Sequence, residues 1–229
     1  MIKAVLFDMD GLMLDTEKLS VRFWIEAGAA FGYTINPAHI HEIRSLPAYA
    51  AAPVLHGFFG EDFDYAEIKA LRTKLFLDHV AAHGVEKKPG LDALLDFLTA
   101  EGFLTAVVTA TGLDRTVYFL KTAGIDEKFT KIIAGNMVER GKPEPDIYRK
   151  AAEAAGVSPD ECIAFEDSPN GVISAFRAGC KVVMVPDLTE PDDKILPLLS
   201  GLARNLTDAV DVVKEIVAAS AQADAESAD

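Results

Sequence analysis

Residues 3–11 read KAVLFDMDG, a short apolar run that is followed by two carboxylates and a glycine. The run up to Phe7 is apolar on both faces, which is typical of a central strand in a parallel sheet. Asp8 stands at the end of this predicted strand, and Asp10 lies on the turn beyond it. Because open α/β sheets bind ligands at the carboxyl ends of their strands, the stretch predicts both a sheet and a site at its edge.

The sequence after this strand divides into a helical block and an alternating part. From residue 17 to about residue 84 the apolar patterns are helical, and the first helix is predicted over 17–31. After Pro89-Gly90, strand and helix patterns alternate, which predicts an α/β fold with a Rossmann-like, doubly wound parallel sheet. The further strands are predicted at 104–109, 131–134, 162–165 and 181–185, and the further helices at 91–100, 113–123, 145–155, from about 169, and at 207–217.

The helical block interrupts the α/β pattern after its first strand, so we predict one core with an insertion. The predicted core spans residues 1–15 and 88–217, and the inserted α-helical cap domain spans 16–87. Asp15 and Thr16 are candidates to cap the first cap helix. Residues 218–229 are Ala, Ser, Gln, Asp and Glu without an apolar pattern, and we predict a disordered acidic tail. A helical insertion beside the carboxyl ends of the strands is well placed to act as a lid.

The composition limits the class of function. The 229 residues include 22 basic and 36 acidic side chains, for a net charge of -14, which disfavours binding to nucleic acid or to an anionic membrane surface. No apolar run approaches the length of a membrane span, and the first one is too short for a signal peptide. Cys162 and Cys180 have no metal-binding or redox spacing, and we expect both to be reduced core residues. We therefore expect a cytoplasmic protein, monomeric by default, that acts on a small molecule.

The residues that follow the predicted strands point to a metal and a phosphate. Two carboxylates about 4 Å apart repel by roughly 4 kcal/mol at an effective dielectric constant near 20, so converging carboxylates need a cation. Oxygen ligands without nearby His or Cys suit Mg²⁺, and Mg²⁺ in turn suits a phosphoryl group. The predicted sheet edge collects Asp8, Asp10 and Gly11 from the first strand, Thr109 and Ala110 from the second, Lys142 from the loop after the third, and Glu166 and Asp167 from the fourth.

Each of these residues has an ordinary structural interpretation when it is taken alone, but their joint position favours phosphoryl transfer. Asp8 can point its carboxylate at phosphorus while Asp10 reaches the leaving-group oxygen, so one can act as nucleophile and the other as general acid and base. Gly11 keeps the turn open for close approach of the backbone. Thr109 can donate to a phosphoryl oxygen, and Lys142 adds positive charge.

The sequence resembles the haloacid dehalogenase superfamily, in its phosphatase and phosphomutase branch with a C1-type helical cap. The resemblance covers residues 2 to about 215 and rests on FDMDG at 7–11, VVTAT at 107–111, GKPEPDIY at 141–148 and FEDSPNGV at 165–172. It implies that Asp8 forms an aspartyl-phosphate and that Asp10 protonates the leaving alcohol and then activates water. It also implies that Thr109 holds the transferring phosphoryl group and that Lys142, at the phosphate-binding site, balances its charge. It also implies that Mg²⁺ binds Asp8, the backbone carbonyl of Asp10, Asp167 and, directly or through water, Glu166.

Two departures from the mutase pattern favour hydrolysis of a small, sugar-phosphate-like phosphomonoester. Where beta-phosphoglucomutase carries a cap histidine this chain has Ser20, and where it carries a cap arginine this chain has Ala48, although Arg44 lies nearby and could substitute. A beta-phosphoglucomutase-like phosphomutase is therefore the alternative function. A phospho-accepting switch without catalysis is a remote alternative, since a slow switch has no use for Asp10, and an inactive binding protein would not need Asp8 and Asp10 together.

Overall fold

Residues 1–226, which the computed structural model describes, contain a six-stranded sheet in the order β3-β2-β1-β4-β5-β6. All five strand pairings are parallel. Ala4 of β1 pairs with Leu104 of β2 on one side and with Cys162 of β4 on the other, so the strand order reverses around β1. The α/β class and the doubly wound parallel sheet are confirmed. The strands are β1 (Ala4–Phe7), β2 (Leu104–Thr109), β3 (Lys131–Ala134), β4 (Cys162–Glu166), β5 (Lys181–Met184) and β6 (Gly201–Leu202).

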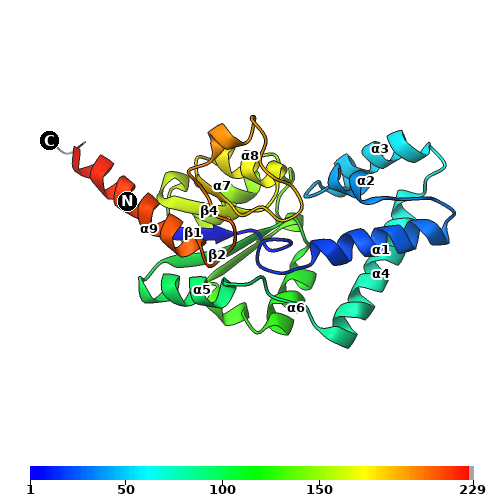
Figure 1. The fold of residues 1–229 in the computed structure, drawn as a ribbon, viewed down its shortest axis with the longest axis horizontal. Coiled ribbons are helices and arrows are strands. Elements are labelled where there is room, and N and C mark those ends of the chain that lie inside the picture. The colour runs from blue at the N-terminus through cyan, green and yellow to red at the C-terminus, as the bar shows by residue number, and fades with distance from the viewer. Residues whose placement is uncertain (227–229) are drawn as a thin grey trace.

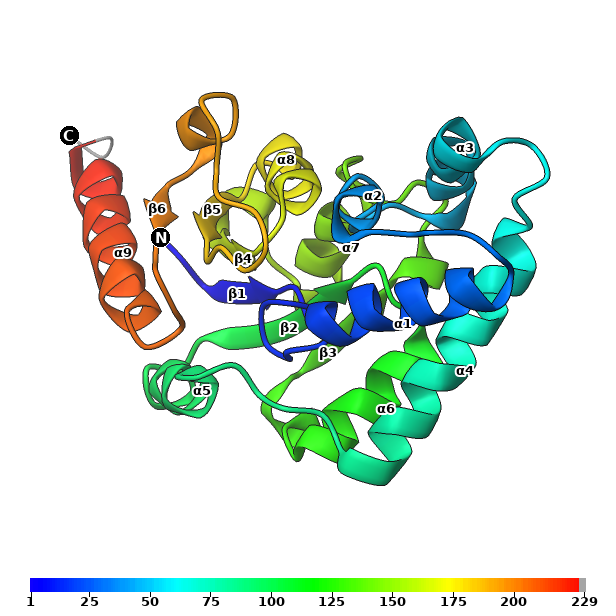
Figure 2. The ribbon, with the colours of Figure 1, turned by 45° about the vertical axis from the view of Figure 1, so that its right-hand side comes forward.

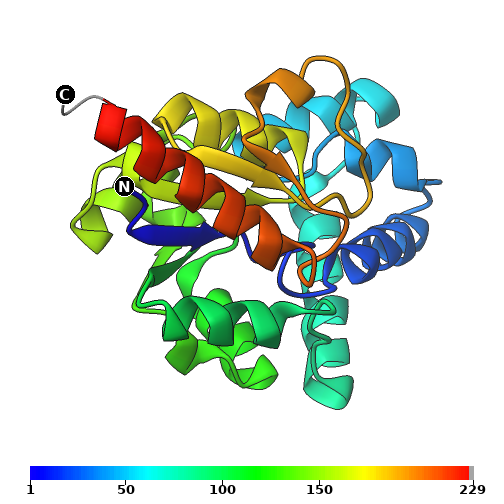
Figure 3. The ribbon, with the colours of Figure 1, turned by 60° about the vertical axis from the view of Figure 1, so that its left-hand side comes forward.

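The two faces of the sheet carry separate hydrophobic clusters because successive side chains of a strand point to opposite faces. Val5 and Phe7 of β1 belong to one cluster, and Ala4 and Leu6 belong to the other. Helices α5, α6 and α9 pack on the first face, and α7 and α8 pack on the second; Figure 3 shows α9 lying across the sheet. These helices are α5 (Leu91–Ala100), α6 (Leu113–Ala123), α7 (Asp146–Ala155), α8 (Pro169–Ala178) and α9 (Ala209–Glu226).

The inserted segment is helical and has a hydrophobic cluster of its own, which includes Trp24, Leu55 and Phe63. Its helices gather beyond the tips of the strands, at the end of the sheet to which β1 points (Figure 1). This placement leaves the segment facing the loops that follow the strands. The helices are α1 (Glu17–Ala30), α2 (Pro37–His41), α3 (Ala48–Phe59) and α4 (Tyr65–His83).

The two connections between the insertion and the sheet run side by side. Leu14 forms an antiparallel bridge with Lys87. The Asp15 N–H donates to the Glu86 carbonyl at 2.9 Å, and the Lys88 N–H donates to the Met13 carbonyl at 2.8 Å. The chain therefore leaves the core and returns to it at one place.

Two features of the C-terminal part differ from the sequence prediction. The short strand β6 was not predicted. The last helix begins at Ala209 and continues to Glu226, so residues 218–226 of the predicted disordered tail are helical, and the rest of that tail lies outside the described residues. The alanines and glutamate there are strong helix formers, and this preference outweighs the missing apolar pattern. Within residues 1–226, no helix combines the length and the apolar character that crossing a membrane requires.

Candidate active site

Asp8 and Asp10 lie where the sequence predicts, on the loop that leaves β1 at the reversal of strand order. Asp8 is buried, and its backbone N–H donates to the Phe165 carbonyl of β4 at 3.0 Å. Three hydroxyl groups surround the Asp10 carboxylate: Thr16 donates to Oδ1 at 2.8 Å, and Thr111 and Thr109 donate to Oδ2 at 2.8 and 3.3 Å. These contacts fix the Asp10 side chain beside Asp8 and draw the end of β2 into the site.

Thr16 therefore has a different role from the predicted one. It occupies the N-cap position of α1, but its side chain makes no capping hydrogen bond. Its hydroxyl is directed to Asp10 instead, so a residue expected to start a cap helix holds a residue of the core site.

Lys142 is fully buried beneath Asp8. Its ammonium Nζ lies 2.5 Å from Asp8 Oδ1 and 2.5 Å from Glu166 Oε1, and it also donates to the Val108 carbonyl at 3.2 Å. Burial alone would lower the pKa of Lys142, but the charges of Asp8 and Glu166 raise it above the usual lysine value. The ammonium consequently stays protonated and offsets the negative charge of Asp8.

Glu166 is fixed by two donors and holds Lys142 in place. Its Oε1 accepts from Lys142 and also from the hydroxyl of Tyr148 at 2.5 Å. Burial, followed by the charges of Glu166 and Asp8, raises the pKa of Tyr148 well above the usual value, so the phenol remains a donor. Tyr148 stands in the GKPEPDIY motif, but sequence reasoning gave it no role, because a buried aromatic residue on a helix is usually a packing residue.

The first testable prediction concerns Gly171, which faces Glu166 from α8. A Cβ atom at this position would lie 1.9 Å from Glu166 Oε2, so Gly171→Ala must displace the carboxylate that orients Lys142. We expect the substitution to lower both kcat and the melting temperature, with an activity loss of about tenfold or more, as for removal of one charge-assisted hydrogen bond.

Gly57→Ala is the matched control, because Gly57 is also helical but has open space around the added methyl group. It should leave kcat unchanged and raise stability by up to about 1 kcal/mol, the usual preference of a helix for alanine over glycine. Equal behaviour of the two variants in kinetics and thermal unfolding would contradict the positioning role of Glu166.

Three of the four predicted metal ligands form a compact carboxylate cluster. Asp8, Glu166 and Asp167 each offer an oxygen within 4.8 Å of the others. Asp167 Oδ1 is buried without a hydrogen-bond partner, and an orphaned carboxylate oxygen of this kind suits a hard cation. Asp8 and Asp167 therefore fit Mg²⁺ best, because Glu166 Oε1 is already engaged by Lys142 and Tyr148. The Asp10 side chain lies outside this cluster, and metal binding through its backbone carbonyl stays a prediction.

The electrostatics of the cluster also favour a cation. Burial raises the pKa of Asp8 to about 8, because Lys142 only partly offsets the lost hydration and because Glu166 and Asp10 add negative charge. A divalent cation beside Asp8 would favour the carboxylate form.

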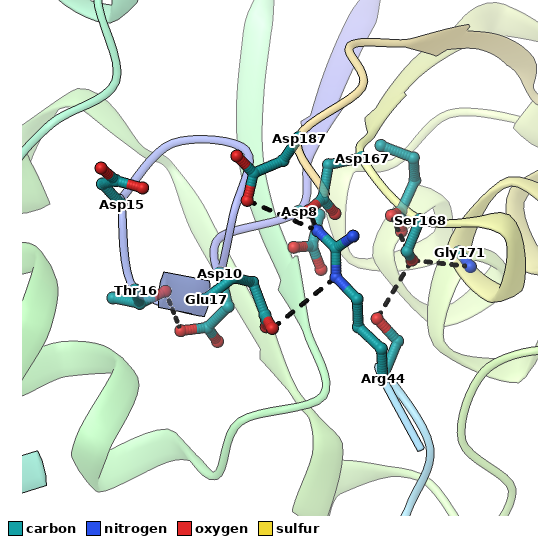
Figure 4. A network of polar contacts seen from close by, with 12 residues as sticks. Asp8, Asp10, Asp15, Thr16, Glu17, Arg44, Asp167, Ser168, Gly171 and Asp187 are labelled. Carbon is teal, nitrogen blue, oxygen red and sulfur yellow. Dashed lines mark hydrogen bonds and ion pairs between the residues drawn. The ribbon is translucent and has the colours of Figure 1, made fainter. Parts of the chain in front are cut away.

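Arg44 reaches this cluster from the inserted segment, as Figure 4 shows. Its Nη2 contacts Asp167 Oδ2 and lies 3.7 Å from Asp187, while its Nε lies 3.6 Å from Glu17. The side chain is buried, so it is a cation supplied to the core by the insertion. The sequence indicated Arg44 as a possible substitute for a missing cap arginine, but its partner Asp167 lies 123 residues away and could not be foreseen.

Gly11 has a structural requirement in addition to its predicted role in the turn. It adopts a φ of +90°, and a Cβ atom there would lie 2.1 Å from Asp167 Oδ2. It lines a second pocket with Lys88 and Pro186, and the cavity beside Asp8 is lined by other residues. Gly11 therefore makes room for Asp167, and its part in phosphate binding stays a prediction.

A cavity of about 190 Å³ lies between the sheet edge and the inserted helices. On the core side it is lined by Asp8, Asp10, Thr109 and Ala110, whereas Lys142 is covered by Asp8. From the insertion, the cavity receives Ser20, Trp24 and Ala48, together with Glu17 and Arg44. Trp24 also belongs to the hydrophobic cluster of the insertion, so it both packs within the insertion and lines the cavity.

Comparison with known proteins agrees with this geometry. The family model of haloacid dehalogenase-like hydrolases matches residues 5–185. Hexitol phosphatase A of Escherichia coli is 33% identical over 201 residues, which cover 83% of this chain and 88% of that protein. Protein CbbY of Rhodobacter capsulatus is 31% identical over 204 residues, with coverages of 84% and 89%.

The fold comparison extends over almost the whole chain. The crystal structure of CbbY from Rhodobacter sphaeroides in complex with phosphate superposes with a TM-score of 0.77 at 27% identity, covering 91% of this chain and 96% of that one. The family match includes the carboxylates at the strand ends, and the phosphatase relative is similar over most of both chains. Together they establish the family of this chain. The chain belongs to the haloacid dehalogenase-like hydrolases and is a phosphoric monoester hydrolase of that family.

Proposed function

We propose that the protein is a Mg²⁺-dependent phosphatase that hydrolyses a small, sugar-phosphate-like phosphomonoester through an aspartyl-phosphate on Asp8. The observation that carries this proposal is the position of Asp8, which lines the cavity, lies 2.5 Å from the buried Lys142 ammonium and has Asp10 fixed beside it. A nucleophile, an acid and base, and a compensating charge are therefore all present on the chain.

In the first half of the reaction an oxygen of the Asp8 carboxylate attacks phosphorus, and the bond from phosphorus to the ester oxygen breaks. Asp10, in its protonated form, transfers its proton to that oxygen, so the alcohol leaves neutral. Thr109 donates to a phosphoryl oxygen, and Lys142 offsets the charge around Asp8 through its direct contact.

In the second half, the Asp10 carboxylate takes a proton from water, and the water oxygen attacks phosphorus. The bond between Asp8 and phosphorus then breaks, which releases phosphate and restores the Asp8 carboxylate. The hydroxyls of Thr16 and Thr111 can hold both protonation states of Asp10, because a hydroxyl both donates and accepts.

Asp8 and Asp167 would hold the metal ion, with Glu166 next to them. When bound, Mg²⁺ would neutralise the carboxylates and polarise the phosphoryl group. Arg44 contacts Asp167 in this structure, so the guanidinium and a cation would share this carboxylate.

The relatives support a phosphorylated sugar or polyol as substrate. They include hexitol phosphatase A and a phosphorylated carbohydrates phosphatase from Thermotoga maritima, which is 28% identical. A screen of phosphate release over sugar phosphates, nucleotides and short phosphorylated acids tests this assignment.

Hydrolysis is favoured over mutase chemistry by the cap residues at the cavity. Ser20 is buried and accepts a hydrogen bond from Arg72, and Ala48 presents only a methyl group, so neither supplies the side chain of the mutase pattern. We expect phosphate release without any requirement for a sugar bisphosphate. A strict bisphosphate requirement with no net release of phosphate would contradict the proposal.

The second testable prediction concerns Asp10. Asp10→Asn removes the proton donor, and general acid catalysis typically contributes about 10² to 10⁴-fold. We expect kcat to fall by this factor on an alkyl phosphate such as glycerol 3-phosphate, but by much less on p-nitrophenyl phosphate, whose leaving group needs no proton. Single-turnover kinetics on both substrates measure the difference, and equal losses on the two substrates would count against this role.

A further inference from the structure

Three cationic side chains meet in the cavity, away from the metal-binding carboxylates. Lys69 and Arg72 lie one turn apart on α4, so they share a face, and Arg115 lies in the first turn of α6. Figures 1 and 2 show α4 beside α6, and the rings of Phe76 and Phe119 connect the two helices at a centroid distance of 5.5 Å. The insertion and the core thus both contribute to this cluster.

None of the three cations has an acidic partner at ion-pair distance among residues 1–226. Arg72 donates to the Ser20 hydroxyl, Arg115 Nη2 donates to the Thr111 hydroxyl at 3.3 Å, and the Lys69 ammonium lies 5.5 Å from the centre of the Tyr65 ring. Arg72 Nε is buried and has no hydrogen-bond partner within the described part of the chain. In a chain with 36 acidic and only 22 basic residues, this lack of partners needs an explanation.

The cluster is electrostatically unfavourable as it stands. Burial and the charge of Arg115 lower the pKa of Arg72 to about 10, and the charges of Glu17 and Asp10 only partly offset this. Burial, together with Arg115 and Arg72, also lowers the pKa of Lys69. Positive charges that lie together in a cavity despite their mutual repulsion are typical of an anion-binding site.

We propose that Lys69, Arg72 and Arg115 bind a second oxyanion group, a phosphate or a carboxylate, at the far end of the substrate. The inference rests on the proposed phosphatase function and narrows its substrate class to phosphomonoesters with a second anionic group. Arg115 contacts Thr111, and Thr111 donates to Asp10, so the cluster begins on the side where the leaving group departs. The reacting phosphoryl group has other partners, since Thr109 and Lys142 serve the position beside Asp8.

Matched substrates test the proposal. Glucose 6-phosphate and p-nitrophenyl phosphate carry no second anion, whereas 6-phosphogluconate adds a carboxylate and glucose 1,6-bisphosphate adds a phosphate at the other end of the same six-carbon chain. We expect kcat/KM to be higher for the two substrates with a second anion, and their relative values distinguish a carboxylate preference from a phosphate preference.

The variants Lys69→Gln and Arg115→Gln should remove that preference. Loss of one charge-assisted hydrogen bond to the anion predicts a fall in kcat/KM of about tenfold or more on 6-phosphogluconate or glucose 1,6-bisphosphate. On p-nitrophenyl phosphate the loss should be clearly smaller in both variants, because that substrate does not reach the cluster. Arg115→Gln should retain some loss there, since Arg115 contacts Thr111, which donates to Asp10. Lys74→Gln is the matched control, since Lys74 lies on the same helix, is exposed and pairs with Asp78 at 2.7 Å.

Equal losses on all substrates would overturn the proposal, because they would assign the cations to the transferring phosphoryl group. Unchanged kinetics in both variants would also overturn it. A different result would show that the proposed phosphatase function itself is wrong: the protein would not hydrolyse p-nitrophenyl phosphate in a way that depends on Asp8. In that case, calorimetry on the wild-type protein decides: tighter binding of 6-phosphogluconate than of glucose 6-phosphate, lost in Arg115→Gln, supports the anion site, and equal binding contradicts it.

Discussion

Replacing Asp8 with asparagine is expected to abolish turnover while the protein stays folded. An amide cannot attack phosphorus, so kcat should fall by about 10⁴-fold or more, the scale of loss of a covalent nucleophile. The fold should tolerate the change, because burial raises the pKa of Asp8 and its charged form is disfavoured in the folded state. Lys142 keeps Glu166 as a partner in the variant.

Three measurements check this expectation: steady-state hydrolysis, acid-quench trapping of radiolabelled phosphoenzyme, and thermal unfolding. Asp96→Asn is the control, because Asp96 is exposed and pairs with Lys128 at the surface. It should retain full activity and full labelling. If Asp8→Asn kept more than a few per cent of the wild-type rate, or still formed a labelled aspartate, the covalent mechanism would be wrong.

Removal of divalent metal is expected to have an effect of similar size. Asp8, Asp10, Glu166 and Asp167 place up to four negative charges around the site, and the substrate adds nearly two more. Lys142 and Arg44 supply two positive charges, so the site with substrate stays negative without a metal ion. Charge stabilisation by a metal ion contributes several kcal/mol, so chelation should lower the rate by about 10³-fold or more. Mg²⁺ should restore activity fully, whereas Ca²⁺ should bind but support little turnover, because its looser and higher coordination misplaces the nucleophile.

Asp167→Ala provides a test of the metal site that does not depend on activity. We expect calorimetry to show much weaker Mg²⁺ binding in the variant, and the Mg²⁺ concentration needed for half-maximal rate should rise in parallel. Asp96→Asn again serves as the control. Undiminished hydrolysis in excess chelator would show that the carboxylate cluster is not a metal site.

The sequence predicts most of the sheet, and its failures have local causes. The five predicted strands are apolar runs bounded by polar residues, and each lies within one residue of its predicted limits. Strand β6 was missed because Gly201 and Leu202 are too few to show a pattern and are placed only by pairing with β5. The end of α9 was missed because residues 218–226 show no apolar spacing, although their helix propensity is high.

The predicted site residues are the ones that the sheet itself brings together. Asp8, Thr109 and Glu166 end neighbouring parallel strands, so their convergence follows from topology alone. Arg44 contacts Asp167, and Lys69 and Arg72 share the cavity with Arg115. Both arrangements depend on how the insertion lies against the core. No local pattern encodes that arrangement, and side-chain spacing along one helix predicts only the face that Lys69 and Arg72 share.

The paired connections at Leu14 and Lys87 have a consequence for evolution. The chain leaves and re-enters the core at adjacent positions. The insertion can therefore be replaced by another segment without a change in the order of the strands. The residues proposed for chemistry all belong to the core, whereas Lys69 and Arg72 belong to the insertion. Replacement of the insertion during evolution can therefore change the substrate while the reaction stays the same.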